Sequence, residues 1–216
     1  MEKLAVALWN YKGGVGKSTI SLILAETAAQ KGLNVVVVDL DGQKNLSSAM
    51  GFVMRNNYFA NITLKDCIAP GDENIEADMF VIDCRPETTV VVENAISFAD
   101  IILVPVIGDF FSAANVGYVW EFIKELDKYP AQASLVKNCF ENTVTTREID
   151  NVLQQQGLSV AGRIPRNANL LRNIASGRPW WVGMDSRQQA PFLDLYSRVW
   201  GAYTNMLKGN FMNPWH

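Results

Sequence analysis

Short apolar runs alternate along the chain with longer segments in which apolar residues recur every three or four positions. The apolar runs predict strands at residues 3–9, 34–41, 78–83, 100–106, 133–138 and 159–165. The helical spacing predicts helices at residues 18–32, 88–98, 112–128, 144–156, 167–176 and 189–208. Gly32 stands where a helix C-terminal cap belongs. The continuous β-branched run in 34–41 is typical of a strand that is buried on both faces.

Strands that alternate with helices predict an α/β fold, a mostly parallel, twisted sheet flanked by helices on both faces. The sequence has no repeat, no low-complexity tract and no linker, so we expect one domain over residues 1–216. Residues 53–77 are the least regular part. Ligands of such sheets bind beyond the carboxyl ends of the strands. The segments that follow these ends are 10–19, 39–45, 83–87, 108–112, 138 and 165–167.

The composition excludes several classes of protein. A chain of 216 residues with 49% hydrophobic residues suits a soluble globular protein. It has neither a membrane-length apolar run nor a basic-then-apolar leader, so we expect a cytoplasmic location. The cysteines Cys67, Cys84 and Cys139 form no CxxC pair, and we expect buried, reduced thiols. The only histidine is His216, which excludes histidine-based triads and metal sites.

The net charge of −3 is unevenly distributed. Residues 1–128 hold 10 Lys/Arg and 17 Asp/Glu, whereas residues 129–216 hold 9 and 5. A basic surface is therefore possible in the second part of an acidic protein. Scattered, solvated arginines are the competing interpretation.

The stretch WNYKGGVGKSTISL, residues 9–22, joins the first strand to the first helix. Its glycines allow backbone N–H groups to surround phosphate oxygens at a helix N-terminus. Lys17 would contact the β- and γ-phosphates, Ser18 would bind Mg²⁺ and Thr19 would bond the α-phosphate. Tyr11 occupies the first glycine position of the usual phosphate loop, and a simple glycine-rich turn is the alternative. The predicted nucleotide-binding residues here are Gly13, Gly14, Val15, Gly16, Lys17, Ser18 and Thr19.

The K-G-G-x-G-K-S-T pattern resembles the loop of the deviant Walker ATPases, which include ParA partition proteins and MinD. The resemblance implies that Lys12 reaches across a nucleotide-sandwich homodimer to the ATP of the partner subunit. A well-placed cation there accelerates phosphoryl transfer by roughly 10³- to 10⁵-fold. Lys12, Lys17 and an acidic residue would then form the catalytic set. A solvated surface lysine is the alternative for Lys12.

Two acidic motifs follow. Asp39 and Asp41 lie two positions apart at a strand end, so their carboxylates should project toward one point, where Mg²⁺ or water would justify their proximity. The stretch DLDGQKNLS resembles the family motif D-x-D-P-Q-x-N, which implies that Asp41 orients the attacking water and Asp39 supports the magnesium shell. FVIDCRPET resembles the second motif, which implies that Asp83 holds Mg²⁺ through water.

The two acidic motifs also depart from the family pattern. Gly42 and Arg85 each replace a proline that is usual in the family. Gly42 makes its turn looser. Arg85 receives no predicted role, because an exposed arginine and a cation at the site are equally plausible.

Later segments resemble the family more weakly. DIILVPVIGDFFSAANV resembles the stretch that leads into a helix at the dimer interface, and RIPRNANLL resembles the turn that lies against adenine. The resemblance implies that Pro165, Arg166 and Asn167 contact the base. Asn138 ends a strand where the family often has an adenine-reading asparagine, and a loop asparagine is the alternative.

The resemblance covers residues 3–208 and implies a function. ParA-like proteins use ATP and Mg²⁺, dimerise, bind nucleoid DNA without sequence preference in the cytoplasm, and release it when a ParB-like adaptor stimulates hydrolysis. The cargo would be a plasmid, a chromosome or another large body. The chain begins at its first strand, so we expect no N-terminal helix-turn-helix segment. The DNA-binding candidates in the basic part are Arg163, Arg172, Arg178 and Arg187.

Two other classes remain as alternatives. A MinD-like switch would dock on membranes, and the last helix has apolar residues at a spacing that suits either a membrane or a core. Because the tail after it holds one lysine, membrane docking is not expected. A metabolic or redox P-loop enzyme, such as a dethiobiotin-synthetase-like ligase or a nitrogenase-reductase-like protein, is the other alternative. The reductase would need cluster cysteines, for which Cys84 and Cys139 are the candidates.

Overall fold

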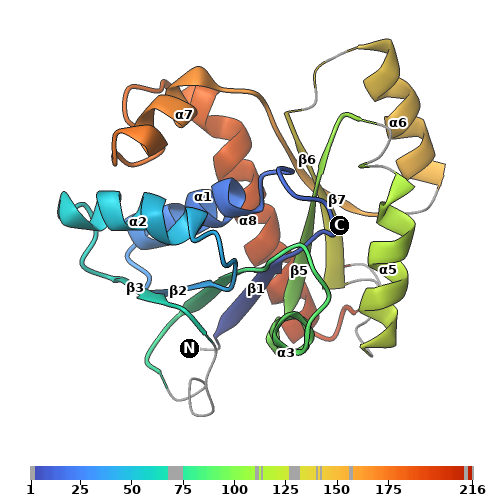
Figure 1. The fold of residues 1–216 in the computed structure, drawn as a ribbon, viewed down its shortest axis with the longest axis horizontal. Helices are drawn as coiled ribbons and strands as arrows, with labels where there is room; N and C mark the ends of the chain where they lie inside the picture. Colours follow the sequence, from blue (N-terminus) through green and yellow to red (C-terminus); the bar gives the residue numbers. More distant parts are fainter. Residues whose placement is uncertain are drawn as a thin grey trace.

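The computed structural model describes residues 3–67, 75–109, 112, 114–126, 132–139, 141, 143–155, 158–211 and 214–215. Seven strands of these residues form one sheet in the order β3-β2-β4-β1-β5-β6-β7, and every neighbouring pair is parallel (Figure 1). The strands are β1 (Leu4–Leu8), β2 (Val35–Asp39), β3 (Ile62–Lys65), β4 (Met79–Asp83), β5 (Ile101–Ile107), β6 (Ala133–Asn138) and β7 (Val160–Ile164).

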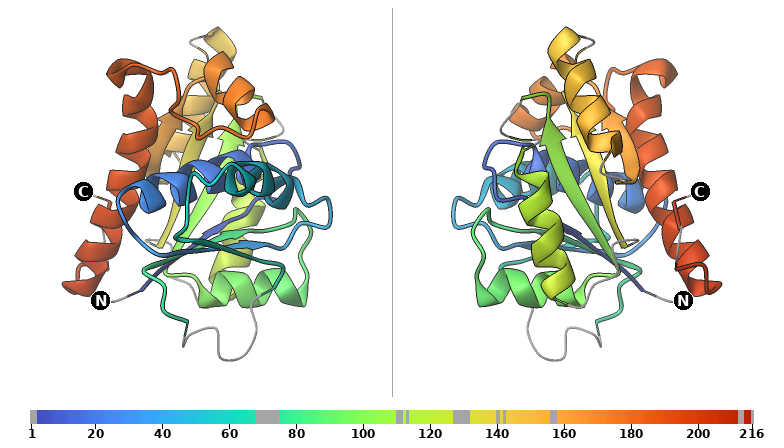
Figure 2. Two further views of the ribbon diagram at one scale, coloured as in Figure 1. Left: turned by 90° about the vertical axis from the view of Figure 1, so that its left-hand side faces the viewer. Right: turned by 90° about the vertical axis from the view of Figure 1, so that its right-hand side faces the viewer.

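Helices cover both faces of the sheet, as the two side views in Figure 2 show. One face carries α1 (Lys17–Gln30), α2 (Asn45–Arg55), α7 (Ala168–Ala175) and α8 (Ser186–Leu207), and the other carries α3 (Val90–Phe98), α5 (Val116–Glu125) and α6 (Val144–Gln155). Alternate residues of each strand point to opposite faces, so the sheet separates two apolar cores. The α/β architecture predicted from the sequence is confirmed.

The register of the central strands brings the chemical residues together. Asp83 at the end of β4 lies opposite Leu8 of β1 on one side and Asp39 of β2 on the other. All of these strands run in the same direction, so the loops that follow them emerge at one edge of the sheet. The sequence predicts the ligand at this same edge.

Helix α2 and strand β3 were not predicted from the sequence. Helix α2 contains Gly51 and begins with a polar stretch, so its local propensity is weak. Strand β3 is a short edge strand in which only Ile62 is buried. It is held by pairing with β2, and the side chain of Asn61 donates to the carbonyls of Ala29 and Leu33 at 3.0 and 2.7 Å. Tertiary contacts therefore create order in a segment that looked irregular.

The ends of the other elements agree with the sequence to within a few residues. Gly32 follows α1 with φ +86°, as a C-terminal cap requires. The predicted helix 112–128 is shorter in the structure, and residues 110, 111, 113 and 127–130 lie outside the described part. Helix α8 starts three residues earlier than predicted, because Asp185 and Gln188 form a capping box.

The cysteines agree only in part with expectation. All three are free thiols, but Cys67 is exposed and Cys139 is half-buried, so the expectation of buried thiols is wrong for Cys67. Cys67 follows the edge strand β3, where the sheet offers little cover. Cys84 is buried, and burial raises the pKa of its thiol.

Candidate nucleotide site

The glycine-rich loop between β1 and α1 has the backbone that the sequence predicted. Gly14 and Gly16 adopt φ values of +74° and +97°, a region that side-chain-bearing residues rarely enter. Gly16 is the N-cap of α1, and no side chain caps this end of the helix. The N–H groups at the start of α1 are therefore available to an anion, and the helix dipole favours negative charge at the same point.

The side chain of Asn138 packs against the phosphate loop and forms a hydrogen bond to it. Its side-chain nitrogen donates to the carbonyl of Val15 at 2.9 Å. A Cβ atom added to Gly16 would lie 2.1 Å from that nitrogen, so the loop and Asn138 are in close contact. Two features favour glycine at position 16, its φ and this contact.

A cavity of about 570 Å³ opens beside the loop. Its walls come from the three segments that follow β1, β2 and β4, which are among the segments predicted to carry the ligand site. The lining residues are Gly13, Gly14, Gly16, Lys17, Ser18, Thr19, Asp41, Gly42, Gln43, Asn45, Arg85, Pro86 and Glu87. The volume and the mixture of loop N–H groups, hydroxyls and one lysine suit a polyphosphate.

Lys17 is buried at the base of this cavity. Its Nζ donates to the carbonyls of Asn10 and Lys12 at 3.3 and 3.1 Å. Burial lowers the pKa of Lys17, and the nearby carboxylates of Asp83 and Asp41 oppose this shift. A buried ammonium group beside a helix N-terminus that no side chain caps is a strong attractor for a phosphate group.

Lys12 points in a different direction. Its Nζ lies 2.7 and 2.6 Å from the two carboxylate oxygens of Asp109, in the segment after β5. Lys12 does not line the cavity beside the phosphate loop, whereas Asp109 lines a second cavity of about 380 Å³ together with Asn138, Glu141 and Arg166. The two lysines of the loop thus face different surroundings, and 27% of the Lys12 side chain is exposed.

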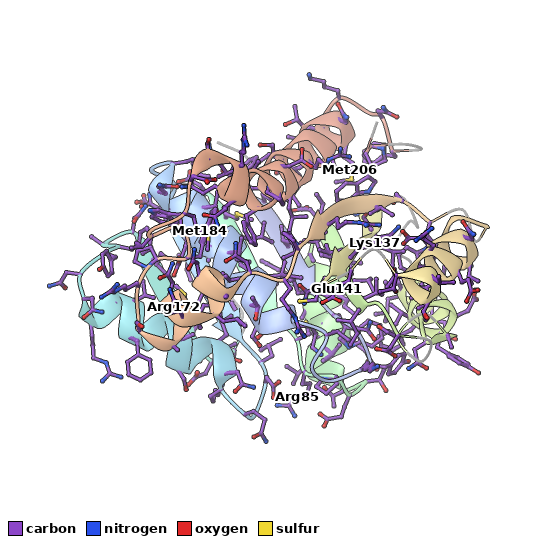
Figure 3. All side chains as sticks on the ribbon, turned by 90° about the horizontal axis from the view of Figure 1, so that it is seen from above. Arg85, Lys137, Glu141, Arg172, Met184 and Met206 are labelled. Carbon is purple, nitrogen blue, oxygen red and sulfur yellow. The ribbon has the colours of Figure 1, made fainter. Side chains whose placement is uncertain are left out.

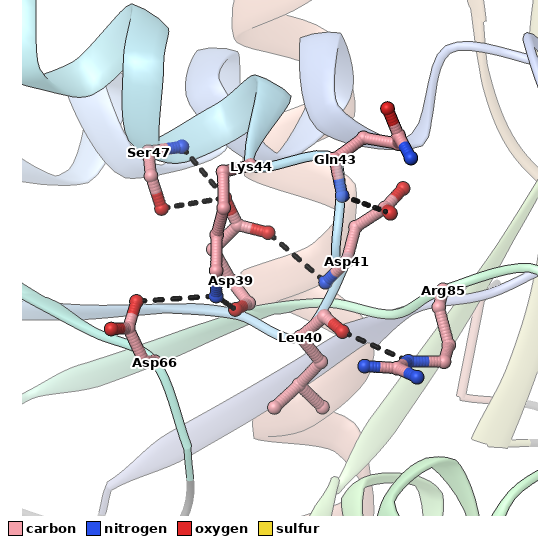
Figure 4. Close-up of polar contacts among 8 residues, drawn as sticks. All are labelled: Asp39, Leu40, Asp41, Gln43, Lys44, Ser47, Asp66 and Arg85. Carbon is pink, nitrogen blue, oxygen red and sulfur yellow. Dashed lines mark hydrogen bonds and ion pairs between the residues drawn. The ribbon is translucent and has the colours of Figure 1, made fainter.

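Asp39 holds the turn after β2 (Figure 4). Its fully buried carboxylate accepts from the backbone N–H of Asp41 at 3.1 Å and from the N–H and hydroxyl of Ser47 at 2.7 and 2.6 Å. These contacts join the turn to the start of α2. Within the described residues, the carboxylate of Asp39 organises the turn that carries Asp41. Its role in binding Mg²⁺ stays a prediction.

Asp83 is also buried, but neither of its carboxylate oxygens has a hydrogen bond of good geometry. Burial raises the pKa of Asp83 to about 7; the neighbouring Ser18 and Lys17 lower it, and Asp39 and Asp41 raise it. An unpartnered buried carboxylate beside a serine hydroxyl and a phosphate-type loop fits Mg²⁺, which is often bound through one or two carboxylates plus phosphate oxygens. Ser18 and Asp83 would hold the ion.

Of the residues predicted to contact adenine, Asn167 already forms hydrogen bonds within the chain. Asn167 is the N-cap of α7, and its side-chain oxygen accepts from the N–H groups of Asn169 and Leu170 at 2.9 and 3.1 Å. Arg166 is exposed and lines the second cavity, together with Asn138. Pro165 is half-buried directly after β7. Contacts of all four with adenine stay predictions.

The four predicted DNA-binding arginines are exposed but do not share one environment. Arg163 is paired with Asp150 at 2.7 Å, and Asp150 also binds the buried Lys137 at 2.6 Å. In Figure 3, Lys137 lies far from Arg172, which is on α7. Arg178 follows α7, and Arg187 lies in the first turn of α8. Arg172, Arg178 and Arg187 are therefore better candidates for one surface than Arg163.

Three residues of the site were not identified from the sequence. Asp109 pairs with Lys12, Ser47 binds Asp39, and Lys44 donates from Nζ to the carbonyl of Asp39 at 2.7 Å. A signal existed for Asp109, because it lies in the segment 108–112 that follows a strand at the ligand edge. Ser47 carried no signal, since helix α2 was not predicted.

Comparisons with known proteins agree with this fold. The Soj protein of Bacillus subtilis, described as a sporulation initiation inhibitor, is 22% identical over 90% of this chain and 97% of its own. The septum site-determining protein MinD of the same organism is 23% identical over 86% of this chain and 84% of its own. A plasmid partition protein from Borrelia burgdorferi, solved as a crystal structure with bound AMPPNP, is 18% identical to this chain. The match covers 92% of this chain and 98% of that protein, with a TM-score of 0.76.

The family described as the CobQ/CobB/MinD/ParA nucleotide binding domain matches residues 6–180, which include the phosphate loop and both acidic motifs. The matched range runs from β1 to the segment after α7. The chain therefore belongs to the CobQ/CobB/MinD/ParA family of nucleotide-binding domains.

Proposed function

We propose that this protein is a ParA-type ATPase that positions DNA or another large cargo in the cytoplasm. ParA- and MinD-type members of the family are ATPases, and the loop, the cavity and the two acidic strand ends support ATP as the ligand. In this proposal Lys17, the loop N–H groups and Thr19 bind the phosphates. Ser18 and Asp83 hold Mg²⁺, which would neutralise developing charge on the phosphates. Asp41, at the wall of the cavity, orients the attacking water.

The observation that carries the proposal is the different orientation of the two loop lysines. Lys17 faces the cavity of its own subunit, whereas Lys12 is held outside it by Asp109. One lysine suffices to bind a phosphate in its own subunit. In this proposal Lys12 contacts a second nucleotide, which a second copy of this chain supplies. ATP-dependent dimerisation follows from this assignment.

The dimer would hold DNA without sequence preference through Arg172, Arg178 and Arg187, on and next to α7, and a cargo-bound adaptor of the ParB type would stimulate hydrolysis. Arg163 is a weaker contributor, because Asp150 already neutralises part of its charge. Binding through arginine–phosphate contacts must weaken steeply as salt is raised.

The central experiment is DNA co-sedimentation with ATP, ADP or no nucleotide, on the native chain and on Lys12→Ala. The native protein should pellet with DNA only with ATP, and Lys12→Ala should remain in the supernatant although it still binds ATP. Lys124→Ala is the matched control, since Lys124 forms an exposed pair with Glu121 on α5. DNA binding that is independent of nucleotide, or is unchanged in Lys12→Ala, would contradict the proposal.

A second variant separates DNA binding from dimerisation. Arg178→Glu should abolish DNA retention and leave ATP-dependent dimerisation intact, because its side chain is exposed and lies outside the phosphate cavity. Light scattering with a non-hydrolysable ATP analogue measures the dimer. Loss of both properties, or of neither, would show that this surface is not the DNA contact.

The MinD-like alternative has a specific counterargument. Most of the apolar positions of α8 that suited either a membrane or a core are packed in the core, where Phe192, Leu195, Val199 and Met206 are buried, whereas Leu207 at the end of the helix is exposed. No helix among the described residues is long and apolar enough to span a membrane. Flotation of the ATP-bound protein with anionic liposomes tests this alternative, and co-flotation without DNA binding would favour it.

The redox alternative requires thiolate ligands. Cys84 is fully buried, and burial raises the pKa of its thiol, which disfavours the thiolate that an iron–sulfur cluster needs. A colourless purified protein excludes this alternative.

A further inference from the structure

The two departures from the family pattern, Gly42 and Arg85, line the same cavity, and Figure 4 shows Arg85 in contact with Leu40, two residues before Gly42. Gly42 follows β2 and Arg85 follows β4, and both line the phosphate cavity. The Nε atom of Arg85 donates to the carbonyl oxygen of Leu40 at 3.0 Å. The acceptor of this hydrogen bond, Leu40, lies two residues before Gly42.

The turn itself spans Asp41 to Lys44. The N–H of Lys44 donates to the carbonyl of Asp41 at 3.0 Å, which makes Gly42 the second residue of a β-turn. Proline is favoured at this position because its ring presets φ, whereas glycine leaves the turn more freedom. The φ of Gly42 lies outside the left-handed region, and an added Cβ atom would meet no atom within 4 Å. Neither of these two features opposes a proline at this position.

The side chains of Arg85 and Lys44 donate hydrogen bonds to the carbonyl groups of two consecutive residues just before this turn. Besides the bond from Arg85 to Leu40, the Nζ of Lys44 donates to the carbonyl of Asp39 at 2.7 Å. Lys44 is steadied by Asp66 at 3.2 Å, in the segment after β3. The backbone between β2 and Asp41 is thus tied to the segments after both neighbouring strands.

The anchored turn carries the residue that the proposed reaction needs. The carboxylate of Asp39 accepts from the N–H of Asp41 at 3.1 Å, and the carboxylate of Asp41 accepts from the N–H of Gln43 at 3.0 Å. A shift of the Leu40 carbonyl would therefore move Asp41 relative to the phosphate loop. A small displacement of a positioned group can lower a rate about 100-fold.

We propose that Arg85 and Lys44 form a two-point clamp on the carbonyls of Leu40 and Asp39, and that this clamp positions Asp41 in place of the proline that Gly42 replaces. Arg85 is a positioning residue in this view. The inference rests on the proposed ATPase function, because Asp41 matters only if water attacks a bound triphosphate.

The kinetic test uses Arg85→Ala, Gly42→Pro and the double variant, with Mg·ATP as substrate. Arg85→Ala should lower kcat about tenfold and leave KM for ATP within about twofold, because the clamp positions Asp41 and does not bind the phosphates. Gly42→Pro should restore kcat to within about threefold in the Arg85→Ala background. Arg198→Ala is the matched control, since Arg198 forms an exposed pair with Asp194 on α8.

Hydrogen exchange measured without nucleotide tests the clamp independently of activity. The amides of residues 41–47 should exchange faster in Arg85→Ala and in Lys44→Met, and Gly42→Pro should reverse the change. If the native protein neither binds nor hydrolyses ATP, the proposed function fails while this measurement still decides the clamp. The clamp is overturned if exchange in Arg85→Ala equals that of the native chain, or if Arg85→Ala weakens ATP binding at constant kcat and Gly42→Pro does not restore it.

Discussion

Helix α1 carries two buried charged side chains, Lys17 in its first turn and Glu26 near its middle, and the two have opposite surroundings. Lys17 lines the phosphate cavity and is flanked by the charges of Asp83 and Asp41. Glu26 is fully buried, and one of its oxygens accepts from the backbone N–H of Trp180 at 2.7 Å. Burial shifts the pKa of both groups, but only one of them faces a cavity and other charges.

The environment of Glu26 is structural. Trp180 is brought to α1 from beyond α7, and its indole Nε1 donates to the hydroxyl of Thr27 at 3.1 Å. Burial raises the pKa of Glu26 to about 8, and the hydrogen bond from Trp180 lowers it. Glu26 therefore fastens the segment after α7 to the helix. A shifted pKa alone does not identify a functional residue, whereas a cavity with convergent charges does.

The largest expected effect comes from removing Lys17. Lys17→Ala should weaken Mg·ATP binding by about 3 kcal/mol, or about 100-fold, because charge-assisted hydrogen bonds to the phosphates are lost. Folding stability should change less than ATP affinity, because removal of a buried charge offsets the loss of its hydrogen bonds to the carbonyls of Asn10 and Lys12. Titration calorimetry and thermal unfolding measure the two quantities. Lys31→Ala, at the exposed C-terminal end of the same helix, is the control, and equal ATP affinities for both variants would refute the assignment of Lys17.

The next effect concerns Glu26 and pH. Because the pKa of Glu26 is about 8 in the folded state and 4.5 as the reference value, its contribution to stability is complete below pH 4.5 and is lost as pH rises through 8. The free energy of unfolding of the native chain should fall by a few kcal/mol more than that of Glu26→Gln between pH 5 and pH 9.

Urea unfolding at several pH values measures this difference, and Glu121→Gln on the exposed side of α5 should follow the native curve. ATP affinity should be the same in Glu26→Gln and in the native chain. Parallel curves for the native chain and Glu26→Gln would mean that Glu26 is not protonated in the folded protein.

The smallest effect is expected from Thr27→Val, which leaves the indole N–H of Trp180 without its acceptor. We expect a loss of about 1 kcal/mol in the free energy of unfolding and no change in nucleotide binding. Thr204→Val on α8 is the matched control, because Thr204 is exposed and bonds only to the carbonyl of Trp200 at 2.8 Å within the described residues. A stability loss as large as that of a core truncation would indicate that Thr27 has another role.

The candidate site was predictable from the sequence where its residues are local. The phosphate loop lies within eight residues, and its glycines are identified by the backbone conformations they allow. Asp39, Asp41 and Asp83 were found because each ends or follows an apolar run. The partner of Lys12 was not, because Asp109 is 97 residues away and the pairing depends on the placement of β5 beside β1.

The same contrast holds for the fold. The β-branched and helical patterns predicted most elements and the parallel sheet, since each pattern reflects the burial of its own segment. Helix α2 and strand β3 have weak local patterns, and their order depends on contacts with β2, α1 and Asp39.

The sequence by itself determined the alternation of strands and helices, the edge of the sheet that carries chemistry, and the phosphate loop, because these depend on the burial and backbone freedom of neighbouring residues. Only the tertiary structure decided that Lys12 pairs with Asp109, that Glu26 lies under Trp180 and that Arg85 holds the turn before Gly42. Each of these contacts joins segments far apart in the chain, and their energies depend on distances that no local pattern encodes.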